Sequence, residues 1–137
     1  MSVSVQWDNS GNTAILYTFS GHWSWDEFRA AWKEGRALVS SVPHQVASIL
    51  NLEGAAGIPS GMLVKGDYVF RSRLPNAGYV VLVSGGGLVN MLVTTFKAMN
   101  SKGGKWVLTA SSLATARAKL AELQHQDHAT AASADGG

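Results

Sequence analysis

The stretch VASILNL at Val46–Leu52 is a near-continuous apolar run, interrupted only by Ser48 and Asn51. Strands that are covered on both faces have this composition, which is typical of parallel sheets. The stretch YVVLV at Tyr79–Val83 has the same character. Together the two stretches predict buried strands of an α/β domain.

Toward the N-terminus, Val3–Trp7 alternates apolar and polar residues, as a half-buried strand does. The segment Asp8–Asn12 contains Gly and Asn, which favour tight turns. Residues Thr13–Phe19 are rich in β-branched and aromatic side chains. We therefore expect an antiparallel hairpin here, and a last strand at Trp106–Thr109.

The helix with the strongest sequence markers follows this hairpin. Ser24 is its expected N-cap, and Glu27, three residues later, completes a capping box. Trp23 and Phe28 have the spacing of a hydrophobic staple, and Pro43 ends the helix. The expected apolar face comprises Phe28, Ala31, Trp32, Gly35, Leu38 and Val39.

Three further helices are expected, at Pro59–Arg71, from Gly87 through Met99, and from Ser112 to Leu123. The element order is then β-β-α-β-α-β-α-β-α. Alternation of strands and helices implies parallel pairing with right-handed crossovers. We expect a mixed, mostly parallel five-stranded sheet with about four helices, forming one α/β domain over residues 1–123. Residues 124–137 are small and polar, and we expect a disordered tail there.

The composition argues against several classes of function. The chain has 137 residues, a net charge of +2 and scattered basic residues, so nucleic acid is not an expected partner. It has no cysteine, which excludes disulfides, thiolate metal sites and cysteine nucleophiles. Met1–Trp7 lacks the features of a signal peptide, and no apolar run is long enough to span a bilayer. We expect a cytoplasmic protein.

The element order and three stretches of sequence resemble the STAS domain, the fold of bacterial anti-sigma-factor antagonists. The stretches are Ile49–Met62, Val80–Val83 and Trp106–Leu120. Within the first, Ser60 stands where that family has its phospho-acceptor serine, whereas Asn51 and Pro59 stand where it has two aspartates. The resemblance implies a divergent STAS-like, non-enzymatic interaction or regulatory module that binds a protein partner or itself. It makes Ser60 a candidate phospho-acceptor.

The best physical indication of a site lies where two predicted parallel strands end and helices begin. Ligands of open α/β sheets bind at that edge, and free N–H groups at helix starts favour anions. The candidate ligand or partner surface comprises Gly57, Ser60, Gly61, Met62, Gly85, Gly86 and Gly87. The alternative to a protein or homodimer partner is therefore a small anionic or lipid-like ligand.

The sequence predicts no enzyme, since no residues form a convincing catalytic constellation and none predicts a metal site or a cofactor. His22 and Asp26 can be written as a dyad, but a carboxylate in the first turn of a helix is explained by the helix dipole. Trp23 and Trp25 alternate across a helix start, so one of them is a candidate for an exposed contact surface. Trp32 is assigned to the core.

Overall fold

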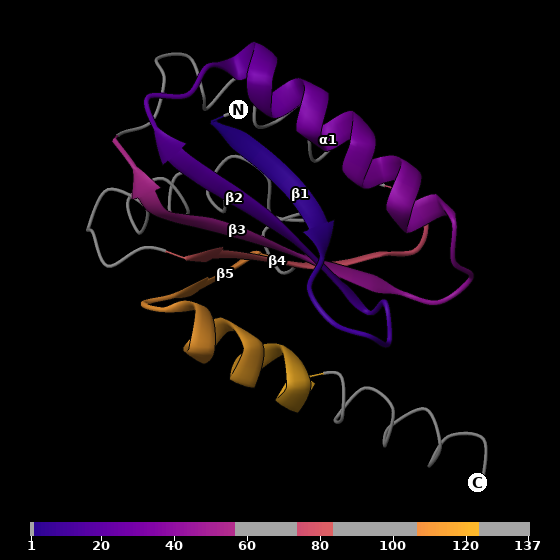
Figure 1. The fold of residues 1–137 in the computed structure, drawn as a ribbon. Coiled ribbons are helices and arrows are strands. Elements are labelled where there is room, and N and C mark those ends of the chain that lie inside the picture. The colour runs from indigo at the N-terminus through magenta and orange to yellow at the C-terminus, as the bar shows by residue number, and fades with distance from the viewer. Residues whose placement is uncertain (1, 57–73, 84–106, 124–137) are drawn as a thin grey trace, which may run out of the picture.

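The computed structural model describes residues 2–56, 74–83 and 107–123 (Figure 1). The elements in this part of the chain are β1 (Val3–Trp7), β2 (Ala14–Gly21), α1 (Trp25–Ser40), β3 (Val46–Ala55), β4 (Ala77–Val83), β5 (Val107–Ala110) and a second helix at 113–123. The sequence predicted each of these elements. The other two expected helices, at Pro59–Arg71 and reaching Met99, lie outside the described residues.

The five strands form one sheet in the order β1-β2-β3-β4-β5. β1 pairs with β2 antiparallel, and the three remaining pairs are parallel. The hairpin and the mixed, mostly parallel sheet are therefore confirmed. At the turn between β1 and β2, Asn12 adopts a left-handed φ of 55°, a conformation that Asn accepts more readily than most residues.

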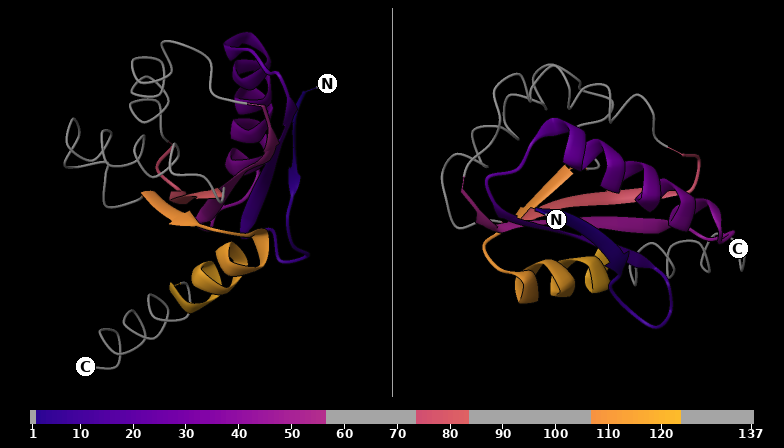
Figure 2. Two further views of the ribbon diagram at one scale, coloured as in Figure 1. Left: turned by 90° about the vertical axis from the view of Figure 1, so that its left-hand side faces the viewer. Right: turned by 45° about the horizontal axis from the view of Figure 1, so that its top comes forward.

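A layer lies on each face of the sheet, with α1 on one side and the helix at 113–123 on the other (Figures 1 and 2). Two buried hydrophobic clusters correspond to these two faces. The cluster on the α1 side is centred on Tyr17, Phe19, Phe28 and Leu50. The cluster on the other side contains Ile49, Val81, Val83, Ala116 and Leu120. β3 and β4 contribute residues to both clusters. Burial on both faces explains the near-continuous apolar runs at Val46–Leu52 and Tyr79–Val83.

The start of α1 is fixed by the capping box that the sequence predicted. The Glu27 backbone N–H donates to Ser24 Oγ at 3.2 Å, and Ser24 Oγ donates to the Glu27 carboxylate at 3.3 Å. The Trp23 and Phe28 rings lie 6.0 Å apart, as expected for a staple. Glu27 also accepts a hydrogen bond from the Ser2 backbone, and that bond contributes most to lowering the pKa of its carboxyl. This contact ties α1 to β1.

The C-terminal end of α1 is held by a residue distant in sequence. The Asn76 amide Nδ2 donates to the backbone carbonyl oxygens of Val39 at 2.8 Å, His44 at 3.0 Å and Val42 at 3.2 Å. α1 has no basic residue in its last turn. A side-chain amide therefore binds the Val39 carbonyl in the last turn of α1 and two carbonyls of the loop that follows the helix.

β3 extends further than the sequence predicted. The sequence predicted a strand over Val46–Leu52, whereas β3 continues through Gly54 and Ala55, which pair with Ser20 and Gly21 of β2. A Cβ atom at Gly54 would lie 2.9 Å from the Phe19 carbonyl oxygen. Glycine therefore permits the close approach of the two strands at this point.

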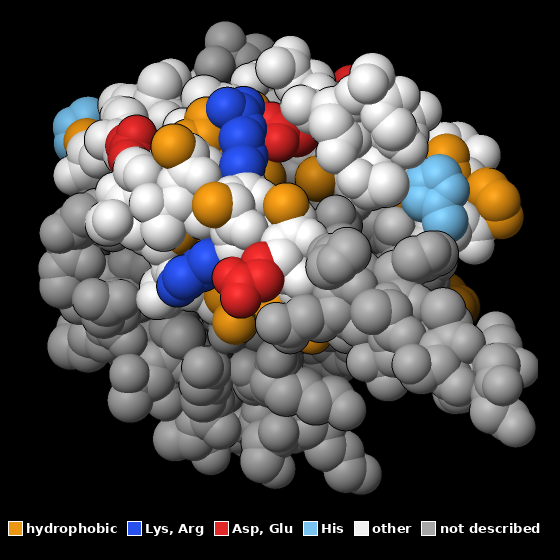
Figure 3. Space-filling view, turned by 90° about the horizontal axis from the view of Figure 1, so that it is seen from below, with side chains coloured by type: hydrophobic (Ala, Val, Ile, Leu, Met, Phe, Trp, Pro, Cys, Tyr) orange, Lys and Arg blue, Asp and Glu red, His pale blue; other side chains and the backbone are white. Residues whose placement is uncertain are grey.

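An ion pair connects the first and last described elements. Arg117, on the helix at 113–123, donates to both carboxylate oxygens of Asp8, at 2.7 and 3.1 Å. These hydrogen bonds raise the pKa of the Arg117 guanidinium. Figure 3 shows the molecule from below the view of Figure 1. On this face, acidic and basic side chains of the described residues are interspersed, with hydrophobic side chains scattered among them.

Candidate functional site

The predicted ligand or partner surface falls outside the described residues. This applies to Gly57, Ser60, Gly61 and Met62 in one segment and to Gly85, Gly86 and Gly87 in the other. Their roles, including that of Ser60 as a phospho-acceptor, stay predictions.

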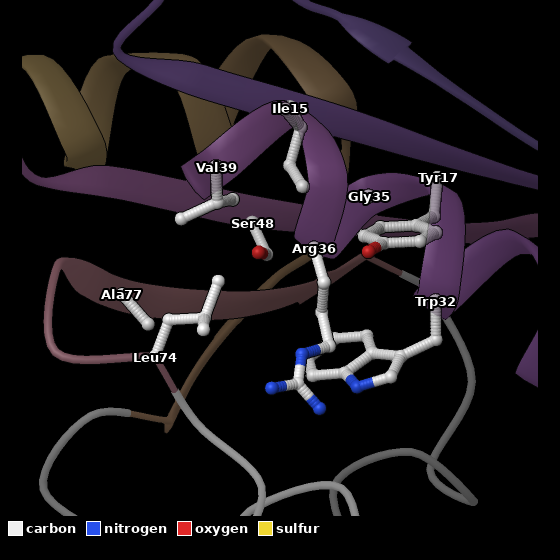
Figure 4. Close-up of a pocket in the computed structure, with 9 residues that line it drawn as sticks. All are labelled: Ile15, Tyr17, Trp32, Gly35, Arg36, Val39, Ser48, Leu74 and Ala77. Carbon is white, nitrogen blue, oxygen red and sulfur yellow. The ribbon is translucent and has the colours of Figure 1, made fainter. Parts of the chain in front are cut away.

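A small pocket lies between α1 and the sheet, near the N-terminal ends of β3 and β4 (Figure 4). It is lined by Ile15, Tyr17, Trp32, Gly35, Arg36, Val39, Ser48, Leu74 and Ala77. Its cavity volume is about 20 Å³, close to the size of one water molecule. The predicted crevice belongs to the opposite ends of the strands, so this pocket is a different site.

Two hydroxyl groups line the strand side of the pocket, those of Tyr17 and the buried Ser48. Tyr17 is 1% exposed, and burial together with the negative charge of Glu34 raises the pKa of its phenol well above the usual value. The Tyr17 hydroxyl occupies the space beside Gly35. A Cβ atom at Gly35 would lie 1.9 Å from that oxygen. Gly35 in mid-helix is thus explained by the tyrosine packed against it.

The helix side of the pocket carries a buried donor and a cation. The indole Nε1 of Trp32 is buried and has no hydrogen-bond partner, the one such side-chain atom among the described residues. Arg36, one turn further along α1, is half-buried and forms no ion pair with the described residues. Both side chains extend toward the lower part of the view in Figure 4. A buried donor without an acceptor costs about 1–3 kcal/mol, so its persistence needs an explanation.

The orientation of Trp32 is fixed by aromatic packing. Its ring is stacked on Tyr17 at a centroid distance of 5.8 Å and lies 5.9 Å from Phe28. Trp25 lies 5.4 Å from the same Phe28 ring. Both tryptophans are half-buried, whereas Trp23 is 7% exposed. Trp25 is therefore the partly exposed member of the Trp23–Trp25 pair, and Trp32 is not fully in the core as the sequence had suggested.

Trp25, Arg29, Trp32 and Arg36 follow each other along α1 at intervals of four, three and four residues. Residues at this spacing form one row on a helix surface. We call this row the α1 stripe. Arg29 and the neighbouring Lys33 are exposed, and neither forms an ion pair within the described chain. The sequence itself shows this spacing. Because Trp32 was assigned to the core, the sequence did not predict the row as a surface.

The pair that the sequence offers as a dyad, and one further histidine, lie in the described part of the chain. His22 and Asp26 are both exposed. His44 forms a contact of 2.8 Å between its Nε2 and the Asn12 carbonyl oxygen, which is a structural role. No group of three potential metal-ligating side chains occurs in the ranges that the structure covers. No helix within those ranges is long and apolar enough to cross a membrane.

No protein-family model and no curated protein matches the sequence of this chain. The resemblance to the STAS domain therefore stays a prediction that rests on the motifs and the element order.

Proposed function

We propose that this chain is a non-enzymatic interaction module that binds a protein partner through the α1 stripe. The observation that carries the proposal is the alternation of two half-buried tryptophans with two arginines in one row, Trp25-Arg29-Trp32-Arg36. Trp and Arg are the residue types most enriched among those that dominate binding energy at protein interfaces. A cytoplasmic location and STAS-like membership belong to the same proposal.

The size of the pocket favours a protein partner over a small-ligand carrier. Sites for small molecules have volumes of about 300–1,000 Å³. The pocket beside the stripe measures about 20 Å³, which is too small for a whole ligand. A partner surface can close over the mouth of this pocket and cover the tryptophans beside it.

The test is native mass spectrometry of the protein purified from its own host. We expect a stoichiometric protein complex that the double variant Arg29→Gln/Arg36→Gln reduces at least ten-fold. The matched control is Ala114→Glu/Ala118→Glu, which lowers the net charge equally at exposed positions on the other side of the sheet. A bare chain, or equal loss in the control, would contradict the proposal. A retained mass of a few hundred daltons would favour the small-ligand alternative.

Self-association is the second candidate, and the β1 edge supports it. The Ser2 carbonyl oxygen accepts from Ser20 N and Asp8 N donates to the Ala14 carbonyl, both at 2.9 Å, so the even-numbered residues of β1 bond to β2. The backbone groups of Val3, Val5 and Trp7 therefore point outward. β1 has no charged residue or proline, the usual protections of an edge strand.

Replacing one outward-facing residue separates self-association from other binding. Val5→Pro removes an outward N–H while leaving the bonds to β2, and Val5→Thr keeps that N–H as a control. If copies pair through β1, light scattering will find a dimer for wild type and Val5→Thr and a monomer for Val5→Pro. A monomeric wild type at high micromolar concentration would exclude this mode.

A further inference from the structure

We infer that the partner of the α1 stripe presents an acidic side chain, whose carboxylate binds between Arg36 and the Trp32 indole N–H. The inference rests on the proposed interaction function and specifies the chemistry of the partner. It commits to a glutamate- or aspartate-bearing protein segment.

The side of α1 that carries the stripe is positively charged. Arg29, Lys33 and Arg36 lie on one side of α1, at intervals of four and three residues. None of them has an ion-pair partner among the described residues. Of the acidic residues of α1, Asp26 and Glu27 lie in the first turn, where the helix dipole and the capping box account for them. The third, Glu34, is exposed and forms no ion pair with the described residues. The three cations thus remain available to an acidic partner.

The second feature of this side of α1 is the Trp32 indole N–H. It is a buried donor without an acceptor, and Arg36 is its neighbour one helical turn away. Arg has several N–H donors and an indole has one, and neither can accept. A group that satisfies both must therefore be an acceptor, and a carboxylate offers two acceptor oxygens together with the negative charge that complements the Arg36 guanidinium. Hydrogen bonds to a charged acceptor are about twice as strong as neutral ones.

A carboxylate on a protein fits this site better than a nucleic-acid phosphate does. Nucleic-acid binding draws most of its affinity from many phosphate contacts along a basic surface. Here the basic row has only three members and the net charge of the chain is +2. The flanking half-buried tryptophans also provide apolar area, which a protein segment can cover.

The experiment follows the Trp32 indole resonance by NMR during titration with two blocked peptides, pentaglutamate and pentaglutamine. Trp32→Phe assigns the resonance. We expect pentaglutamate to shift it with an affinity at least ten-fold higher than that of pentaglutamine. Arg36→Gln should lower the pentaglutamate affinity at least five-fold. Ala114→Glu, which changes the net charge equally at an exposed position across the sheet, should leave it within two-fold.

Each failure has a distinct meaning. Equal shifts with both peptides would overturn the carboxylate inference and leave the interaction function standing. Equal losses of pentaglutamate affinity in Arg36→Gln and Ala114→Glu would show that only the net charge of the chain matters. That result would overturn the inference as well. No shift with either peptide, together with a bare chain in native mass spectrometry, would remove the proposed function too. A ten-residue oligothymidylate that binds more tightly than pentaglutamate would assign the stripe to nucleic acid.

Discussion

At the scale of single residues, the contact between Tyr17 and Gly35 sets how closely α1 lies on the sheet. A Cβ atom at position 35 would meet the Tyr17 hydroxyl at 1.9 Å and its ring carbon Cζ at 2.8 Å. Overpacking costs about 1–3 kcal/mol and here outweighs the gain of about 1 kcal/mol when Ala replaces Gly inside a helix. Gly35→Ala should therefore lower the free energy of unfolding by about 1–2 kcal/mol in urea melts. In a Tyr17→Phe background the same substitution should cost less, and an equal cost would contradict this account.

The same tyrosine predicts a loss of stability in alkali. Burial and Glu34 raise the pKa of Tyr17 in the folded chain, so the unfolded chain loses this proton first as the pH rises. The stabilising contribution is complete below the unfolded pKa of about 10 and falls above it, by up to about 1.4 kcal/mol per pH unit. Urea melts between pH 9 and pH 11 should show this slope. Tyr17→Phe should flatten it, and an unchanged slope would assign the loss to other groups.

At the scale of elements, Asn76 joins α1, the loop after it and the start of β4. Its amide donates to three carbonyl oxygens, those of Val39, Val42 and His44. Asn76→Asp would turn three attractions into repulsions between a carboxylate and carbonyl groups. We expect a loss of at least about 2 kcal/mol at neutral pH, larger than that of Asn76→Ala. Denaturant melts of both variants measure the difference, and a smaller loss for Asp would show that the site relaxes or admits water.

The elements that the sequence predicted best are those specified by local chemistry. The Ser24–Glu27 capping box lies within four residues, and the apolar run at Val46–Leu52 reflects burial on both faces. The exposure of Trp32 could not be predicted in this way, because it depends on where α1 sits. α1 packs mainly on β1 and β2, which leaves the flank that carries Trp32 half-exposed beside the pocket. The extension of β3 through Gly54 likewise depends on a neighbouring strand.

At the scale of the whole molecule, the ion pair between Asp8 and Arg117 joins the hairpin to the helix at 113–123. The Asp8 side chain is 6% exposed and that of Arg117 is 51% exposed. Arg117→Gln leaves a nearly buried carboxylate without its cation, so we expect a loss of about 1–2 kcal/mol. The double variant Asp8→Asn/Arg117→Gln should lose less than the sum of the single variants. Additive losses in melts would show that the pair contributes no coupling energy.

The order of the strands has a consequence for how the chain is made. Each strand pairs with the strand before it in the sequence, from β1 to β5, so no strand has to insert between two that are already paired. During synthesis, β1, β2, α1 and β3 can associate as soon as residue 55 has left the ribosome. The later described strands then add at one growing edge, and Asp8 can pair with Arg117 only after the helix at 113–123 has been made. The ion pair therefore forms only after all five described strands have been synthesised.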